Sequence, residues 1–279
     1  MGRPHQGASP IRLKIRHETH YEFDAPAHYG LQRLRLTPKT TQGQTILDWQ
    51  MSVEGGTRQL EYEDQNHNHI TLVSVDEGVE QVVVSCEGEV DTADYAGVIG
   101  KHAGHLPLWA FCTNSDKTRP GRAMKALLGE FDSSKVRDVG LLHELSAAIR
   151  DQVGYVKGAT HATTSAEEAM AAGSGVCQDH AHIFLGLARE LDVPARYISG
   201  YLMMNDRVDQ EASHAWAEAH VEGLGWVGFD ISNGISPDER YVRVATGRDY
   251  REAAPITGRT QGARDSGLEV RLSVEQQQQ

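Results

Sequence analysis

Apolar and polar residues alternate along the first third of the chain. Ile11, Leu13 and Ile15 alternate with basic residues. Further apolar runs recur at regular intervals: 31–36, 46–53, 70–75 and 79–84. A period of two is typical of strands with one buried face. Several such strands separated by turn residues, such as Gly55 and Gly56, predict an antiparallel β-sandwich, which we place at residues 1–105.

The middle of the chain changes to a helical period. Apolar residues recur every three or four positions over 139–153, which predicts a helix. Residues 106–138 carry a weaker pattern punctuated by prolines, and we interpret them as a connector. A second helix is predicted for 166–172, because Ser165 and Glu168 have the spacing of a capping box at its start.

The last third of the chain combines one more helix with short strands. The helix is predicted for 178–191, and Pro194 marks its end. Strands are predicted for 196–203, 213–221, 226–231 and 267–274. We expect residues 139–279 to form an α+β core in which this helix packs on an antiparallel sheet.

Cys177 stands where a glycine-rich turn meets the start of this helix. Gly173 and Gly175 precede it and allow a tight turn beside the thiol. The free N–H groups and the dipole at a helix start favour a thiolate and can hold a developing oxyanion. Cys177 is therefore a candidate nucleophile, and the alternative is a structural cysteine buried at a helix start.

His214 and Asp230 lie on two adjacent strands joined by a short loop. An imidazole is the usual base for a catalytic thiol. With an odd loop of three or five residues, the two side chains share one face of the sheet. Asp230 would then hold Nδ1–H of His214 and leave Nε2 for Cys177. The alternatives are a half-exposed strand histidine and an aspartate that starts a turn.

A metal site receives little support from the sequence. On one helix Cys177 and His180 share a face, but His182 does not, so the three do not converge. We interpret residues 67–69 as a polar turn and the histidines of 102–105 as solvated. No calcium loop of the EF-hand kind occurs, so no metal or other cofactor is expected.

Composition and charge narrow the class of protein. The chain has 279 residues, a formal net charge of −12 and three cysteines. An acidic surface repels phosphates and anionic lipid, so we expect neither nucleic acid nor a membrane as partner.

The few cysteines lack C-x-x-C spacing and fit a reducing compartment. Residues 1–10 show no signal-peptide pattern, and no segment nears the roughly 20 apolar residues of a membrane span. A cytoplasmic protein is expected, and its oligomeric state is not predicted.

Three motifs together resemble the transglutaminase-like superfamily in its bacterial cysteine-protease branch. They are Gly-Val-Cys-Gln-Asp-His-Ala-His at 175–182, Ser-His-Ala-Trp at 213–216 and Gly-Trp-Val-Gly-Phe-Asp at 225–230. Segments 21–26, 34–38 and 241–250 resemble the N-terminal domain and the C-terminal segment of that branch. One departure follows Asp230, where Ile-Ser-Asn replaces the usual Pro-Thr-Asn.

The resemblance implies a β-sandwich followed by a papain-like core with Cys177, His214 and Asp230 as a catalytic triad. It implies acyl transfer on a peptide or carboxamide bond through a thioester. For such a bacterial chain we favour hydrolysis; transamidation and a catalytically silent binding module on the same fold are the alternatives.

The oxyanion site is less well defined by the resemblance. Transamidases of this family use a tryptophan upstream of the cysteine, and no tryptophan lies between Trp109 and Cys177. The backbone N–H of Cys177, with Tyr155 or the Gln178 amide, is the expected replacement, and core packing is the alternative role of Tyr155. Trp216 is a candidate on the substrate side, and its alternative role is a wall of the sheet core.

Overall fold

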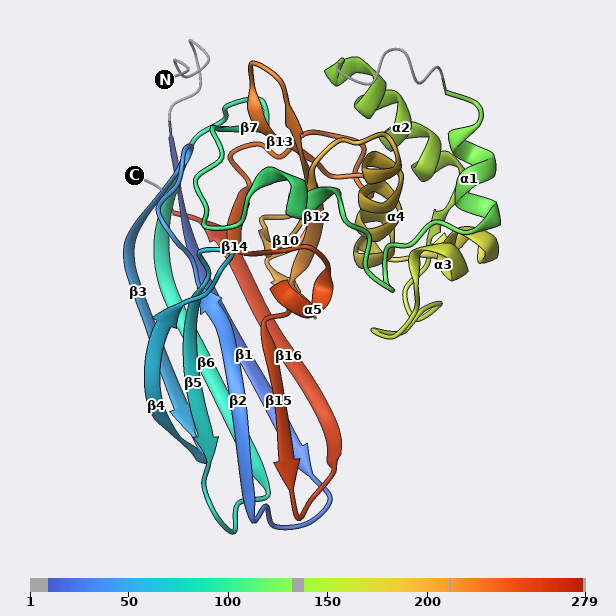
Figure 1. The fold of residues 1–279 in the computed structure, drawn as a ribbon. Helices are drawn as coiled ribbons and strands as arrows, with labels where there is room; N and C mark the ends of the chain where they lie inside the picture. The colour runs from blue at the N-terminus through green and yellow to red at the C-terminus, as the bar shows by residue number, and fades with distance from the viewer. Residues whose placement is uncertain (1–9, 132–137, 211, 278–279) are drawn as a thin grey trace.

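The computed structural model describes residues 10–131, 138–210 and 212–277. The prediction that no signal peptide is present rests on residues 1–10, nearly all of which lie outside the described part. The described chain forms a long β-sandwich and, above one of its ends, a helical layer packed on a second β-structure (Figure 1).

Two antiparallel sheets form the sandwich. Sheet A has the order β11-β16-β1-β6-β3, and sheet B has the order β15-β2-β5-β4. Sheet A consists of β1 (Ile11–Phe23), β3 (Gln44–Glu54), β6 (Gln81–Thr92), β11 (Asp209–Gln210) and β16 (Asp265–Gln276). Sheet B consists of β2 (Tyr29–Thr37), β4 (Gly56–Glu63), β5 (His69–Val75) and β15 (Ile256–Gln261). Buried residues such as Leu34, Val73 and Val84 fill the space between the sheets.

The alternating pattern predicted the sandwich correctly but missed β4. All but one of its residues are exposed, so no apolar alternation marks it in the sequence. It is held in place by main-chain pairing with β5, from Gly56 opposite Val75 to Glu63 opposite His69. A strand of this kind is specified by its neighbour and not by its own hydrophobic pattern.

The predicted domain boundaries need a correction at the C-terminal end. We predicted that residues 139–279 form the second unit, but β15 and β16 belong to the sandwich. Strand β16 lies beside β1 from Leu13 opposite Gln276 to Phe23 opposite Asp265, and β15 pairs with β2. Leu272 and Val274 of β16 are buried in a core shared with β1. The chain therefore returns to complete the domain in which it began.

The second unit is built on sheet C, whose strand order is β14-β10-β12-β13-β7. Its strands are β7 (Val98–Gly100), β10 (Ala195–Leu202), β12 (His214–Val221), β13 (Gly225–Phe229) and β14 (Tyr241–Gly247). The remaining elements are η1 (Leu108–Cys112), α1 (Arg122–Leu128), α2 (Val139–Gln152), α3 (Ala166–Ala172), α4 (Cys177–Glu190), α5 (Tyr250–Ala253) and the short strands β8 (Gly154–Tyr155) and β9 (Ser174–Gly175).

Helix α4 lies at the centre of this unit, between sheet C and the helices α1, α2 and α3 (Figure 1). Every residue of α4 from Asp179 to Arg189 is buried. The predicted connector also contributes here, because Met124 and Leu127 of α1 pack in the same core. Strand β7, which we predicted as part of the sandwich, instead extends sheet C. A helix covered on all sides is a rigid support for the residues at its start.

Buried hydrogen bonds join the sandwich to sheet C. The side-chain amide of Asn68 donates to the carbonyl of Thr246 at 2.7 Å and accepts from its N–H at 2.7 Å. Gln44 makes the same two-way contact with the backbone of Arg243, at 2.8 Å in both directions. Both contacts end on β14, so the sandwich fixes one edge of sheet C. Within the described ranges no helix is long and apolar enough to cross a bilayer.

Candidate active site

The turn before Cys177 is built by short-range contacts that the sequence predicted in part. Ser165 and Glu168 form the expected capping box at the start of α3. The helix ends at Gly173, whose φ of 67° lies in the left-handed region that glycine adopts without strain. The chain then forms β9, which pairs in parallel with β8, and enters α4 at Cys177.

Asp179 closes the first turn of α4. Its Oδ2 accepts from the N–H of Val176 at 2.8 Å and from the hydroxyl of Thr160 at 2.6 Å. A Cβ on Gly175 would lie 2.8 Å from the Asp179 side chain, so only glycine fits there. Asp179 is 1% exposed and acts as a first-turn acid at the helix start, where the free N–H groups and the helix dipole stabilise its negative charge.

His214 and Asp230 are brought together by the register of β12 and β13. Val221 pairs with Gly225 across a loop of three residues, which is the odd loop the prediction required. Continuing this register sets Asp230 opposite Trp216 and diagonal to His214 on the same face. The imidazole Nε2 and the carboxylate Oδ2 are 2.6 Å apart.

The nitrogen of His214 that faces Asp230 differs from the prediction. We expected the carboxylate on Nδ1, but it holds Nε2. The reason is geometric. Asp230 is the diagonal neighbour of His214 on the sheet face, and Nε2, the ring nitrogen farther from the main chain, reaches its carboxylate. The other ring nitrogen, Nδ1, is consequently the one left for the thiol. The two ring nitrogens therefore exchange roles relative to the prediction, but Asp230 still orients His214 as the base.

Asp230 is buried within a set of donors that the sequence did not reveal. Oδ2 also accepts from the hydroxyl of Tyr241 at 2.7 Å and from the Asn233 side-chain amide at 2.7 Å. Oδ1 accepts from the Asn233 N–H at 3.1 Å. Burial alone would raise the pKa of Asp230, but the hydrogen bond and charge of His214, with Tyr241 and Asn233, bring this pKa below its usual value.

The same contacts stabilise a protonated His214. Burial lowers the pKa of an imidazole, yet hydrogen bonds to Asp230 and Cys177 and the negative charges of both raise the pKa of His214 from 6.5 to about 10. His214 is only 9% exposed. The arrangement therefore favours an imidazolium held between a carboxylate and a sulfur, the charge pattern of an activated thiol.

The three candidates on the oxyanion or substrate side occupy different positions. Tyr155 is 51% exposed, so the alternative of core packing is wrong. Partial burial and then the negative charges of Cys177 and Asp230 raise the pKa of Tyr155. Its main chain pairs with Gly175, two residues before Cys177. Gln178 is half-buried in the first turn of α4.

Trp216 corrects another prediction. It is 2% exposed and stacks on His214 with ring centroids 6.1 Å apart. It also meets Tyr241 edge to face at 5.4 Å. Trp216 is therefore a buried core residue that packs against the imidazole of His214, which was its alternative interpretation, and not a substrate-side residue.

The two histidines that follow Cys177 are engaged in the fold. His180 lies 2.8 Å from the hydroxyl of Ser232 through Nδ1 and 2.8 Å from the carbonyl of Val153 through Nε2. His182 is fully buried, and its Nε2 accepts from the Tyr250 N–H at 3.1 Å. Both ring nitrogens of His180 thus have partners, which agrees with the argument against a metal bound by Cys177, His180 and His182.

A cavity of about 750 Å³ opens on the face of sheet A. Charged residues of β1, β6 and β16 line it, together with Asp209 and Gln210 of β11. Strand β11 lies four residues before His214 and pairs with β16 at Leu272 and Ser273. The cavity is thus bordered by the segment that leads into the candidate site.

Two family profiles match this chain. Residues 13–91 match the bacterial transglutaminase-like N-terminal region, and residues 125–231 match the transglutaminase-like superfamily. The second match includes Cys177, His214 and Asp230. The chain belongs to the transglutaminase-like superfamily. The structure adds β14 to the transglutaminase-like core and returns β15 and β16 to the N-terminal region.

The relatives of this transglutaminase-like chain match it almost from end to end. An uncharacterized protein of Mycobacterium leprae (strain TN) is 26% identical over 94% of this chain and 98% of its own length. One of Mycobacterium tuberculosis (strain H37Rv) is 24% identical over 88% and 87%. The crystal structure of a candidate cysteine protease from Cytophaga hutchinsonii shares the fold, with a TM-score of 0.76 and 23% identity over 97% of this chain and 92% of that one.

Proposed function

We propose that this protein is a cysteine hydrolase that cleaves a peptide or carboxamide bond through a thioester on Cys177. The observation that carries the proposal is the 2.6 Å contact of buried Asp230 with His214, next to a cysteine at a helix start. Membership of the transglutaminase-like superfamily supports a thiol-dependent enzyme.

In the first half of the proposed reaction, the Cys177 thiolate attacks the substrate carbonyl and a C–S bond forms. The negative oxygen that results is held by the N–H groups at the start of α4, which have no carbonyl within the helix to bind. Tyr155, whose main chain pairs with Gly175 two residues before Cys177, is the proposed second donor. The C–N bond then breaks, and protonated His214 gives its Nδ1 proton to the leaving amine.

In the second half, neutral His214 takes a proton from water, which attacks the thioester carbonyl. The C–S bond breaks, a carboxylic acid leaves and the Cys177 thiolate is restored beside protonated His214. If a primary amine attacks instead, the product is a new amide and the reaction is transamidation. Asp230 keeps its charge throughout and stabilises the imidazolium state of His214.

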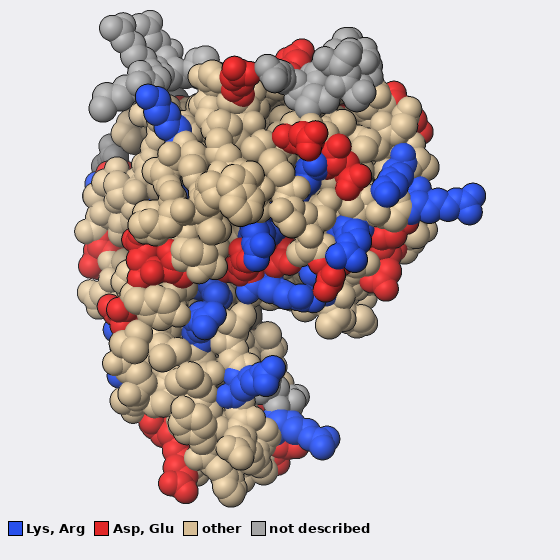
Figure 2. All heavy atoms as spheres, in the orientation of Figure 1, with Lys and Arg blue, Asp and Glu red and all other residues tan. Residues whose placement is uncertain are grey.

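The proposed substrate is a peptide or a protein. The cavity of about 750 Å³ beside β11 has the volume to hold a peptide segment, although Cys177, His214 and Asp230 do not line it. Figure 2 shows Lys and Arg mixed with Asp and Glu over one face of the molecule, without an extended basic area on that face for a phosphate backbone. Nucleic acid and membrane lipid therefore remain outside the proposal, which includes a cytoplasmic location consistent with the three free cysteines.

Alkylation of the three thiols tests the thiol chemistry without a known substrate. Burial raises the pKa of Cys86 to about 12 and also raises the pKa of Cys112. Iodoacetamide should therefore label Cys177 first, and His214→Ala should remove that preference. Equal labelling of Cys112 and Cys177 in the wild type would instead favour a catalytically silent binding module.

A peptide library then separates the two reactions. Wild type and Cys177→Ala are incubated with peptides, with and without a primary alkylamine, and the products are weighed by mass spectrometry. Hydrolysis gives products whose summed mass exceeds that of the peptide by one water. Transamidation gives a product that carries the alkylamine. The proposal expects the first result to dominate even when the amine is present.

A further inference from the structure

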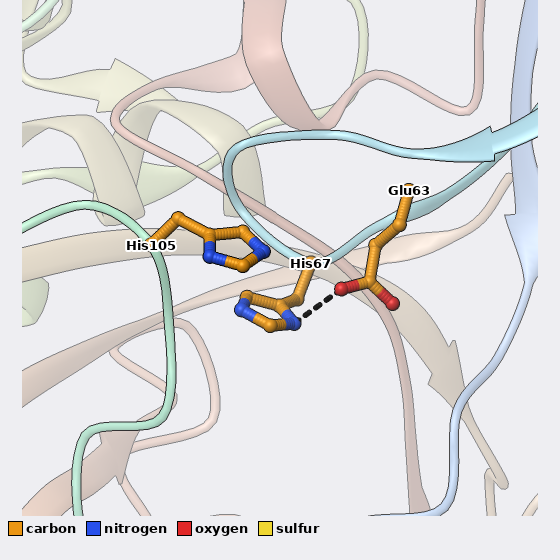
Figure 3. A group of neighbouring side chains, drawn as sticks. All are labelled: Glu63, His67 and His105. Atoms are coloured by element: carbon orange, nitrogen blue, oxygen red, sulfur yellow. Dashed lines mark ion pairs between the residues drawn. The ribbon is translucent and has the colours of Figure 1, made fainter.

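Glu63, His67 and His105 meet at one point outside the candidate active site (Figure 3). They come from the end of β4, the turn that follows it and the loop after β7. One possible ligand atom from each lies within 4.8 Å of the others. His67 Nδ1 faces Glu63 Oε1, and the rings of His67 and His105 are stacked with centroids 4.3 Å apart. The cluster unites residues 42 positions apart in the chain.

The turn that carries His67 is held rigidly. Oδ1 of Asp64 accepts from the N–H groups of Asn66 at 2.8 Å and Asn68 at 2.9 Å. His67 itself has a φ of 60°, a conformation that non-glycine residues adopt at a cost. Since Asn68 is also bound to β14, the turn is fixed to sheet C. The backbone therefore holds the imidazole of His67 toward Glu63 and His105.

A second histidine fixes the loop that carries His105. The indole of Trp226 donates to Nδ1 of His102 at 3.1 Å, and Nε2 of His102 donates to the carbonyl of Leu106 at 2.7 Å. His102 is thus structural, which corrects its prediction as a solvated residue. Anchored in this way, the loop carries His105 to His67 while its side chain remains exposed.

We propose that Glu63, His67 and His105 form a binding site for a divalent transition-metal ion of the zinc class. Imidazole nitrogen and carboxylate oxygen are ligands that Zn²⁺ accepts, at bond lengths of about 2.0–2.2 Å. Such bonds hold ligand atoms about 3–3.5 Å apart in a tetrahedron, so binding would draw the three ligand atoms, now within 4.8 Å of one another, closer together and turn the stacked imidazole rings toward the ion. The fourth position is left to solvent.

Lys39 sets the strength of this site. Its ammonium group contacts Oε2 of Glu63 and the carbonyl of His67. That contact leaves Oε1 directed at the histidines and neutralises the carboxylate in the metal-free state. A bound cation would be repelled by Lys39, so the site is tuned to moderate affinity. Removing this positive charge should strengthen metal binding.

The bound ion would join the loop after β7 to the segment formed by the end of β4 and the turn that follows it. It would fasten the loop after β7 to the sandwich, on the side of sheet C where Asn68 and Thr246 already join the two units. The role inferred is therefore structural. It does not depend on the proposed hydrolase activity.

Calorimetric titration of Zn²⁺ into the full chain tests the site. Cys177→Ser serves as the background, so that the Cys177 thiol cannot bind the ion together with His214, and a chelator removes bound metal first. The test variants are Glu63→Gln, His67→Asn and His105→Ala. Asparagine tolerates the left-handed backbone at position 67, so His67→Asn should fold. His28→Ala, an exposed histidine in another turn, is the matched control.

The proposal expects one Zn²⁺ per chain, binding at least about tenfold weaker in each test variant since each loses a ligand, and unchanged binding in His28→Ala. Lys39→Gln should bind more tightly than its parent. Co²⁺ should give the visible absorption of a ligand-bound ion in the background protein and lose it in His105→Ala. Zinc binding that is absent from the parent, or equal in the parent and all three variants, would overturn the site.

Discussion

Tyr241 donates a hydrogen bond of 2.7 Å to Oδ2 of Asp230, the oxygen that also accepts from His214. The tyrosine comes from β14, on the far side of β10 from the strand of His214. Asp230 is therefore oriented from two directions, and the orientation of His214 depends on both.

Tyr241→Phe removes this second donor and keeps the ring. We expect a fall in the free energy of unfolding of about 1.5–3 kcal/mol, because the bond is made to a buried charge. Proposed hydrolysis should slow with little change in KM, since Tyr241 is only 6% exposed and its hydroxyl is bound to Asp230. Tyr29→Phe, at an exposed tyrosine, is the control. Urea unfolding and steady-state kinetics give the answer, and values equal to wild type in both would show that the bond is dispensable.

Asp230→Asn tests the orientation of His214. An amide can present its N–H to Nε2 and leave the imidazole with its proton on the wrong nitrogen. We expect alkylation of Cys177 and peptide cleavage to slow, the latter by about 10²- to 10⁴-fold. His220→Ala, on the strand of His214, should behave as wild type. The assignment of Asp230 fails if the variant cleaves peptides at the wild-type rate.

Stability should depend on pH through His214. Its pKa rises from 6.5 to about 10 on folding, so the folded state binds the proton more tightly. The resulting stabilisation is complete below about pH 6.5, declines above it and is gone once the pH has passed about 10. Urea unfolding at a series of pH values between these limits should show the decline in wild type and a flatter profile in His214→Gln. Parallel profiles would contradict the shift.

Two leucines of β16 test whether the last strand completes the sandwich. Leu272 is 3% exposed in the core shared with β1, and Leu268 on the same strand is 61% exposed. Leu272→Asp buries a charge, so we expect a loss of more than about 3 kcal/mol or failure to fold. Leu268→Asp should be nearly neutral. Thermal unfolding followed by circular dichroism compares them, and similar effects of both would argue against the pairing.

Local sequence patterns predicted the parts of the structure that depend on interactions between neighbouring residues. The capping box of Ser165 and Glu168, the glycine end of α3 and the start of α4 at Cys177 all follow from neighbouring residues. The odd hairpin loop was enough to place His214 and Asp230 on one face, because side chains alternate along a strand.

Long-range contacts lay beyond such reasoning. Asn233 is three residues from Asp230, so an aspartate-initiated turn could have suggested it, but nothing in the sequence points to Tyr241. The exposed strand β4 carries no pattern of its own, and the tail gives no sign that it pairs with β1 instead of the nearer sheet C.

The sequence by itself determined the candidate nucleophile, the residues paired with it and the two kinds of domain, because short spacing and periodicity control helix starts, hairpins and buried faces. Only the tertiary structure decided which nitrogen of His214 meets Asp230, which strands complete the sandwich, and that Glu63, His67 and His105 converge. Those features depend on how distant segments are packed against one another, and their residues have no fixed spacing along the chain.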